Sequence, residues 1–194
     1  MQDFWFYIKL GLDHVLDFSA YDHILFLCAL AVPFTFKSWK KVVLLATIFT
    51  ITHCLSLSLS AYEVVVVDVA WIEFLIPVTI LLTALFNLLY VWTSKANNNM
   101  WLHFVATAFF GLIHGFGFSN YFKMLVATEE EKLSPLLGFA TGIEIAQVLI
   151  VLSVLALAYL FQSILKLGQP LFIGIVSILI ICITIPMLVN TFPM

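Results

Sequence analysis

Charged residues are scarce in this chain of 194 residues, in which Asp, Glu, Lys and Arg together make up 10%. Arginine is absent altogether, so the chain lacks the side chain best suited to bind phosphate groups in pairs of hydrogen bonds. The formal net charge of −3 offers no basic surface either. We therefore expect no nucleic-acid partner.

Cysteine is also scarce, and Cys28, Cys54 and Cys182 are spread over three different apolar segments. Their spacing fits neither a disulfide framework nor a Cys-x-x-Cys metal motif. Cys54 directly follows His53, but adjacent helical residues point about 100° apart, so we do not expect them to share a ligand role. The cysteines are interpreted as small core residues.

Apolar residues dominate what remains, at 63% of the chain and with a mean hydropathy of +1.14, which is typical of a membrane protein. About 20 apolar residues cross the hydrocarbon core as a helix. The predicted fold class is therefore all-α, a polytopic membrane helix bundle of about six transmembrane helices that forms a single domain over residues 1–194. The expected spans are roughly 21–36, 42–61, 69–92, 100–122, 134–165 and 170–189.

The first twenty residues mix aromatic side chains with Asp3, Asp13 and Asp17. This pattern predicts an interfacial segment at the N-terminus. A cleaved signal peptide would have a basic start and an unbroken apolar run, and both are missing.

The lysines indicate an orientation, because the side of the membrane with more lysine in its loops usually faces the cytoplasm. With six spans, both termini are then expected outside the cytoplasm, in the bacterial inner membrane, together with the acidic run Glu129–Glu131. The lysines on the predicted cytoplasmic side are Lys37, Lys40, Lys41, Lys95 and Lys166, and those on the other side are Lys9, Lys123 and Lys132.

Histidines and carboxylates are the only strongly polar residues within five of the predicted spans. An ionisable side chain at membrane depth costs about 2.5 kcal/mol or more, so it usually faces the bundle interior and marks a site or a pathway. These residues are Asp22, His23, His53, Glu73, His103, His114 and Glu144.

His103 and His114 lie on one stripe of the fourth span, but about 16 Å apart along the helix axis. They cannot bind the same ion, and His103 is expected near the membrane boundary. His114 lies deeper and is followed by Gly115 and Gly117, where the missing side chains let a neighbouring helix or a ligand approach closely.

His53 shares a helical face with Thr50, Ser56 and Ser60 on the second span. The hydroxyl groups have two interpretations. They could orient the imidazole or line a polar path, or they could simply bond back to helix carbonyls while the helices pack.

The carboxylates lie on the third and fifth spans. Glu73 precedes Pro77, which lacks an N–H and tends to kink its helix. Glu144 follows Gly138 and Gly142, which are spaced as a small-residue packing face. Either glutamate could instead be a protonated group that is hydrogen-bonded across the bundle.

Imidazole and carboxylate ligands together suit borderline divalent ions such as Ni, Co, Zn or Fe. The scarcity of thiolates argues against a Cu(I) site or a structural zinc site. The residue types therefore predict a divalent transition metal ion, of the Ni, Co or Zn type, as the bound species.

Five runs of the sequence resemble, in order, the motif blocks of the HupE/UreJ family of bacterial integral membrane proteins. The resemblance extends over about residues 11 to 150 and implies a nickel or cobalt permease, or an accessory protein that supplies these metals to hydrogenase and urease. It also implies that the metal residues are His14, Asp22, His23, His53, Glu73, His114 and Glu144. The runs are GLDHVLDFSAYDHILFL, TITHCLSLSL, IEFLIPVTI, FFGLIHGFGF and GFATGIEIAQ.

The leading hypothesis is an integral membrane protein that binds and transports a divalent transition-metal ion, with the lipid bilayer and the ion as its partners. Outer acidic loops, with His14 or His103, would receive the ion, and Glu73 and Glu144 would balance charge or exchange protons. A homo-oligomer or a partner in metalloenzyme maturation is also consistent with this hypothesis. Two alternatives stay open: an intramembrane zinc-dependent hydrolase, and a structural membrane subunit without metal.

Overall fold

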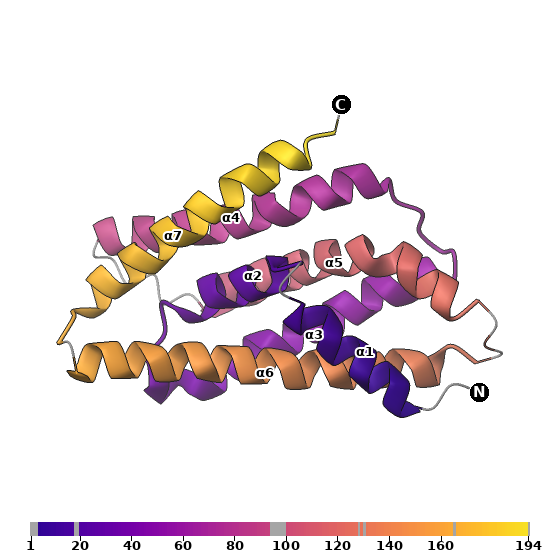
Figure 1. Ribbon diagram of the computed structural model, residues 1–194, viewed down its shortest axis with the longest axis horizontal. Coiled ribbons are helices and arrows are strands. Elements are labelled where there is room, and N and C mark those ends of the chain that lie inside the picture. Colours follow the sequence, from indigo (N-terminus) through magenta and orange to yellow (C-terminus); the bar gives the residue numbers. More distant parts are fainter. Residues whose placement is uncertain are drawn as a thin grey trace.

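The computed structural model describes residues 4–17, 20–93, 100–127, 129, 131–164 and 166–193, and contains helices but no strand in these ranges (Figure 1). The predicted all-α fold class is therefore confirmed. The helices are α1 (Phe4–Leu16), α2 (Asp22–Ala31), the short 3-10 helix η1 (Phe36–Ser38), α3 (Trp39–Ala61), α4 (Val69–Thr93), α5 (Met100–Leu125), α6 (Leu133–Ile164) and α7 (Gln169–Asn190).

Five of these helices are long and apolar enough to cross a membrane, judged by length and composition: α3 together with η1, and α4 to α7. They correspond to the last five predicted spans, and the ends of α3 to α7 themselves lie within three residues of the predicted ends, while η1 extends the first of them to Phe36. The agreement follows from the length of the apolar runs. In lipid, a single segment can make all its backbone hydrogen bonds internally only as a helix.

The first predicted span, 21–36, is wrong in its extent. α2 has ten residues, from Asp22 to Ala31, and at 1.5 Å per residue it covers about 15 Å, half of the hydrocarbon thickness. The N-terminal residues supply the other half. Phe4, Trp5 and Phe6 are exposed, as expected for an interfacial segment, but the next turns of α1 bury Ile8, Gly11 and Val15 inside the bundle.

Hydrogen bonds place α1 and α2 at opposite ends of the bundle. The Tyr7 hydroxyl on α1 donates to Glu129 Oε1 at 3.2 Å, in the connection between α5 and α6. Just beyond α2, the Pro33 carbonyl accepts a bond of 2.9 Å from Gln169 Nε2, at the start of α7. The two short helices therefore form one broken crossing between the long helices (Figure 1), and the end of α1 meets the start of α2 inside the bundle.

The charges separate along the bundle as predicted. We call the end that carries Glu63, Asp68, Glu129 and Glu131 the acidic end, and the end that carries Lys37, Lys40, Lys41 and Lys166 the lysine end; Lys95 and Glu130 lie outside the described residues. Both ends of the described chain lie toward the acidic end, because α1 begins near Glu129 and the Phe192 ring lies 5.4 Å from the Phe74 ring near the start of α4. This arrangement agrees with six crossings.

Glycines on α5 allow it to pack directly against the backbone of α3. A Cβ atom at Gly111 would overlap the Phe49 carbonyl, and one at Gly115 would overlap the His53 carbonyl and the Ser56 hydroxyl. The predicted close approach at Gly115 is thus confirmed. Small residues four apart commonly bring membrane helices together. Here the backbone of His53 contacts Gly115, the residue that follows His114.

A second glycine contact joins α1 to α6. Gly11 lies against the backbone of Phe139 and Gly142, and a Cβ at Gly142 would overlap the Ile8 carbonyl. The helix that packs against the face predicted from Gly138 and Gly142 is therefore α1. This contact holds the end of α1 deep in the bundle.

We expect Gly115→Ala to lower the free energy of unfolding by about 1–3 kcal/mol, because the added methyl group forces α5 away from α3. Thermal unfolding in detergent measures the change. Gly174→Ala on α7 is the matched control, since nothing lies within 4 Å of a Cβ there, and it should be neutral or stabilise the helix by up to about 1 kcal/mol. Equal behaviour of the two variants would contradict the packing account.

Candidate metal centre

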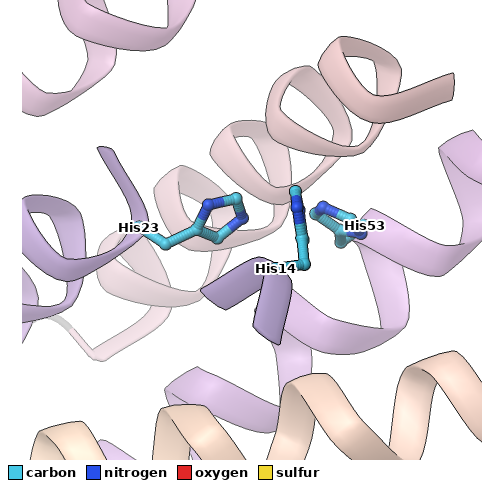
Figure 2. Close-up of side chains that lie close together, drawn as sticks. All are labelled: His14, His23 and His53. Carbon is cyan, nitrogen blue, oxygen red and sulfur yellow. The ribbon is translucent and has the colours of Figure 1, made fainter. Parts of the chain in front are cut away.

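Three histidines from three helices meet at the break in the first crossing (Figure 2). His14 is at the end of α1, His23 is at the start of α2, and His53 is on α3. One ring nitrogen from each lies within 4.8 Å of the other two. A tetrahedral ion at about 2.0–2.1 Å from each nitrogen needs them about 3.4 Å apart, so small rotations of the rings would close the group on one ion.

His114 on α5 adds a fourth imidazole. Its ring centroid lies 5.3 Å from that of His23, and its side chain is 1% exposed. The structure thus brings His23 and His114 together with His14 and His53. We call these four residues the histidine centre.

Each histidine of the histidine centre has a buried Nε2 atom that no hydrogen bond occupies in the part of the chain that the structure describes, so this atom can bind a metal ion. The Nε2 atoms of all four residues are buried, and none has a hydrogen-bond partner among the described residues. His114 Nδ1 donates to the Phe110 carbonyl at 2.8 Å, so the proton belongs on Nδ1 and the lone pair on Nε2. A neutral imidazole of this tautomer is the form that binds a metal ion.

Asp22 supports His23 through two hydrogen bonds to one of its carboxylate oxygens. Asp22 Oδ1 accepts hydrogen bonds from the backbone N–H of His23 at 2.8 Å and from His23 Nδ1 at 3.2 Å. A carboxylate on one imidazole nitrogen fixes the ring and strengthens the other nitrogen as a ligand. The structure thus gives Asp22 a position behind His23, within reach of the charge of a bound ion.

Aromatic rings enclose the histidine centre. The Phe118 ring lies 4.0 Å from His14 and stacks on Phe139, toward the acidic end. Toward the lysine end, the Phe49 and Phe26 rings lie 5.1 Å and 5.3 Å from the His114 ring. Such walls exclude water and lower the local dielectric, which strengthens electrostatic interactions inside.

Glu73 lies outside the histidine centre. It is exposed on the second turn of α4 and lines a cavity of about 220 Å³ together with Asp22 and Pro77. Pro77 has no N–H to donate to the Glu73 carbonyl. Glu73 therefore offers both its carboxylate and its carbonyl oxygens to a cation. Asp22 connects this cavity to His23.

Glu144 is bound by threonines at a separate place between α3 and α6. Thr47 Oγ1 lies 2.6 Å from Glu144 Oε1, and Thr50 Oγ1 lies 2.6 Å from Glu144 Oε2. Glu144 is therefore hydrogen-bonded across the bundle, from α6 to α3, as the second interpretation of the glutamates expects. Sequence reasoning missed Thr47, because only the helix contact reveals which residues of α3 face Glu144.

The hydroxyl groups near His53 bond to backbone and carboxylate groups. Ser56 Oγ donates to the His53 carbonyl at 2.8 Å, and both nitrogens of the His53 ring have no partner among the described residues. Of the two interpretations offered for these hydroxyls, back-bonding is the one observed for Ser56. The hydroxyls do not orient the imidazole.

His103 lies apart from the histidine centre, as its helical spacing predicts. It is on the first turns of α5, toward the lysine end, and its ring lies 5.6 Å from Phe34. Of His14 and His103, which were both candidates to receive the ion with the acidic loops, His103 therefore lies at the end of the bundle opposite to these loops.

A model of one protein family, described as HupE / UreJ protein, matches residues 1–191 of the chain. No curated protein and no solved structure matches it. The family match extends over the whole of the helix bundle, including every residue of the histidine centre.

We expect alanine at His14, His23, His53 or His114 to weaken metal binding by more than about 100-fold, since each removes a ligand that hydrocarbon surroundings cannot replace. Asp22→Asn should weaken it by about 10–100-fold, the usual effect of losing a supporting carboxylate. Titration of purified protein with Zn or Ni in detergent measures both effects. His103→Ala is the matched control, and full binding by all four alanine variants would contradict the site.

Proposed function

The chain belongs to the HupE/UreJ family of membrane proteins, and from this premise and the geometry of its histidines we propose that it binds a divalent transition-metal ion inside the helix bundle and carries it across the membrane. The ion is the transported substrate. Ni, Co and Zn fit the ligand set best, because imidazole suits all three and the group contains no thiolate.

The observation that carries the proposal is the set of buried Nε2 atoms without partners. A structural role for the histidines would require them to be hydrogen-bonded to each other or to the backbone, because an unpaired buried polar group costs about 1–3 kcal/mol. A metal ion held by His14, His23 and His53 would offset this cost at three of the four positions. This argues against the interpretation as a structural subunit without metal.

The acidic end provides the entry for the ion. Glu73 and Asp22 line one cavity, and two carboxylates raise the local concentration of cations. Asp22 then passes the ion to His23, to which it is already hydrogen-bonded. If the lysine end faces the cytoplasm, as the lysine distribution predicts, the ion enters from outside.

The break between α1 and α2 supplies the means of movement. Broken helices at the substrate site are typical of transporters that open to one side of the membrane at a time. In the present conformation Phe26 and Phe49 close the lysine side of His114. Movement of α2 relative to α3 would separate these rings and release the ion.

A zinc-dependent hydrolase is the second candidate, and it rests on the compact group of His14, His23 and His53. Three imidazoles with an open fourth position are the usual ligand set of catalytic zinc. Such an enzyme also needs a carboxylate that activates the metal-bound water. Asp22 Oδ1 is bonded to His23 and Glu144 to Thr47 and Thr50, so Asp22 would have to take this role through its other oxygen, Oδ2.

Vesicles loaded with a metal-sensitive dye test the proposal. Wild-type protein should carry Ni, Co or Zn inward under at least one direction of pH gradient, and uptake should fall at acid pH because the imidazoles must be neutral to bind. A protein that binds zinc tightly but moves no Ni, Co, Zn, Fe or Mn under either gradient is not a transporter, and the hydrolase would then be favoured.

Glu73→Gln tests the entry in the same vesicles. We expect uptake to slow by up to about 10-fold at low ionic strength and less in high salt, while equilibrium binding at the histidine centre is unchanged. Glu63→Gln is the control, because Glu63 is an exposed acid at the same end that does not line the cavity. Equal slowing by both variants would show a general surface effect and no specific entry.

A further inference from the structure

A second and larger cavity lies near the lysine end. It has a volume of about 850 Å³ and lies between α2, α4 and α5. This is the size of a site for an organic molecule and far exceeds what a single ion needs. None of the residues of the histidine centre lines it, although Phe26 and Phe110, which both contact His114, form its inner wall.

The cavity opens toward lipid along its side. Phe86 on α4 and Leu102 on α5 both line it, and they are 61% and 52% exposed. These residues belong to helices that are apolar and long enough to span a membrane. Water in such an opening would contact large apolar side chains, whereas a hydrocarbon chain would cover them.

The polar groups at the lysine end of the cavity suit an anion. Lys41 lines the cavity together with the hydroxyl residues Thr35 and Ser38, and Lys37 and Lys40 lie close by in the sequence. No aspartate or glutamate lines it among the described residues. Lys41 and the two hydroxyl groups offer a phosphate group one positive charge and two hydrogen-bond donors.

We propose that this cavity binds one anionic phospholipid, with the phosphate at Lys41 and an acyl chain that extends inward to Phe26 and Phe110. Basic pockets between membrane helices are the usual sites for anionic headgroups. The bound chain packs on Phe26, one of the two rings that close the lysine side of the histidine centre. The lipid thus supports the closed arrangement of these rings.

Native mass spectrometry from mixed micelles tests the proposal, with phosphatidylglycerol and phosphatidylcholine of identical chains in equal amounts. Wild-type protein should retain one phosphatidylglycerol in preference to phosphatidylcholine. Lys41→Gln should lower this retention about fivefold, the usual effect of one lysine at a lipid headgroup. Lys40→Gln is the matched control, because Lys40 lies over the Trp39 ring and does not line the cavity.

A second pair of variants tests the acyl-chain position without changing charge. Ala106 lines the cavity and Ala108 does not, so Ala106→Phe should abolish preferential retention while Ala108→Phe preserves it. Four results would overturn the proposal: no retained lipid, equal retention of both lipids, equal effects of the two lysine variants, or a dimer whose formation excludes lipid.

Discussion

The burial of unpaired imidazole nitrogens is the constraint on which the rest of this structure depends. Four Nε2 atoms lie inside the bundle without partners among the described residues, and each such group costs about 1–3 kcal/mol when nothing binds it. A polar interior in a membrane bundle is maintained only where it serves binding or passage. The helix contacts, the broken first crossing and the aromatic walls can all be understood as ways to hold these nitrogens close together and dry.

Glycine contacts and a broken helix bring the four histidines within reach of one another. The backbone contact of α3 with α5 places His53 near His114, and the contact of α1 with α6 holds His14 in the middle of the bundle. Because α2 begins as a separate helix, His23 faces the other three, with its ring 4.7 Å, 5.6 Å and 5.3 Å from those of His14, His53 and His114. A continuous first helix would place His14 and His23 about 13 Å apart along its axis, too far to share an ion.

The sequence predicts the long helices well because each is a single apolar run, as the near agreement of the predicted 69–92 with Val69–Thr93 illustrates. It does not predict that residues 4–31 form one crossing, since neither α1 nor α2 alone resembles a span. The spacing of residues shows which side chains share a helical face. It does not show how deep a side chain lies in the bundle or which residues of other helices it contacts. The sequence therefore groups Glu73 and Glu144 with the histidines, although Glu73 lines a separate cavity beside Asp22 and Glu144 is bound by Thr47 and Thr50. His14 was found through family resemblance and not through its own surroundings in the sequence.

X-ray absorption at the metal edge of protein loaded with one equivalent of zinc tests the central claim most directly. A centre built from the four histidines predicts a first shell of nitrogen, or of nitrogen with one water oxygen, at about 2.0–2.1 Å. It also predicts the outer-shell scattering of at least three imidazole rings. A sulfur shell at about 2.3 Å, or an oxygen shell without imidazole scattering, would contradict it.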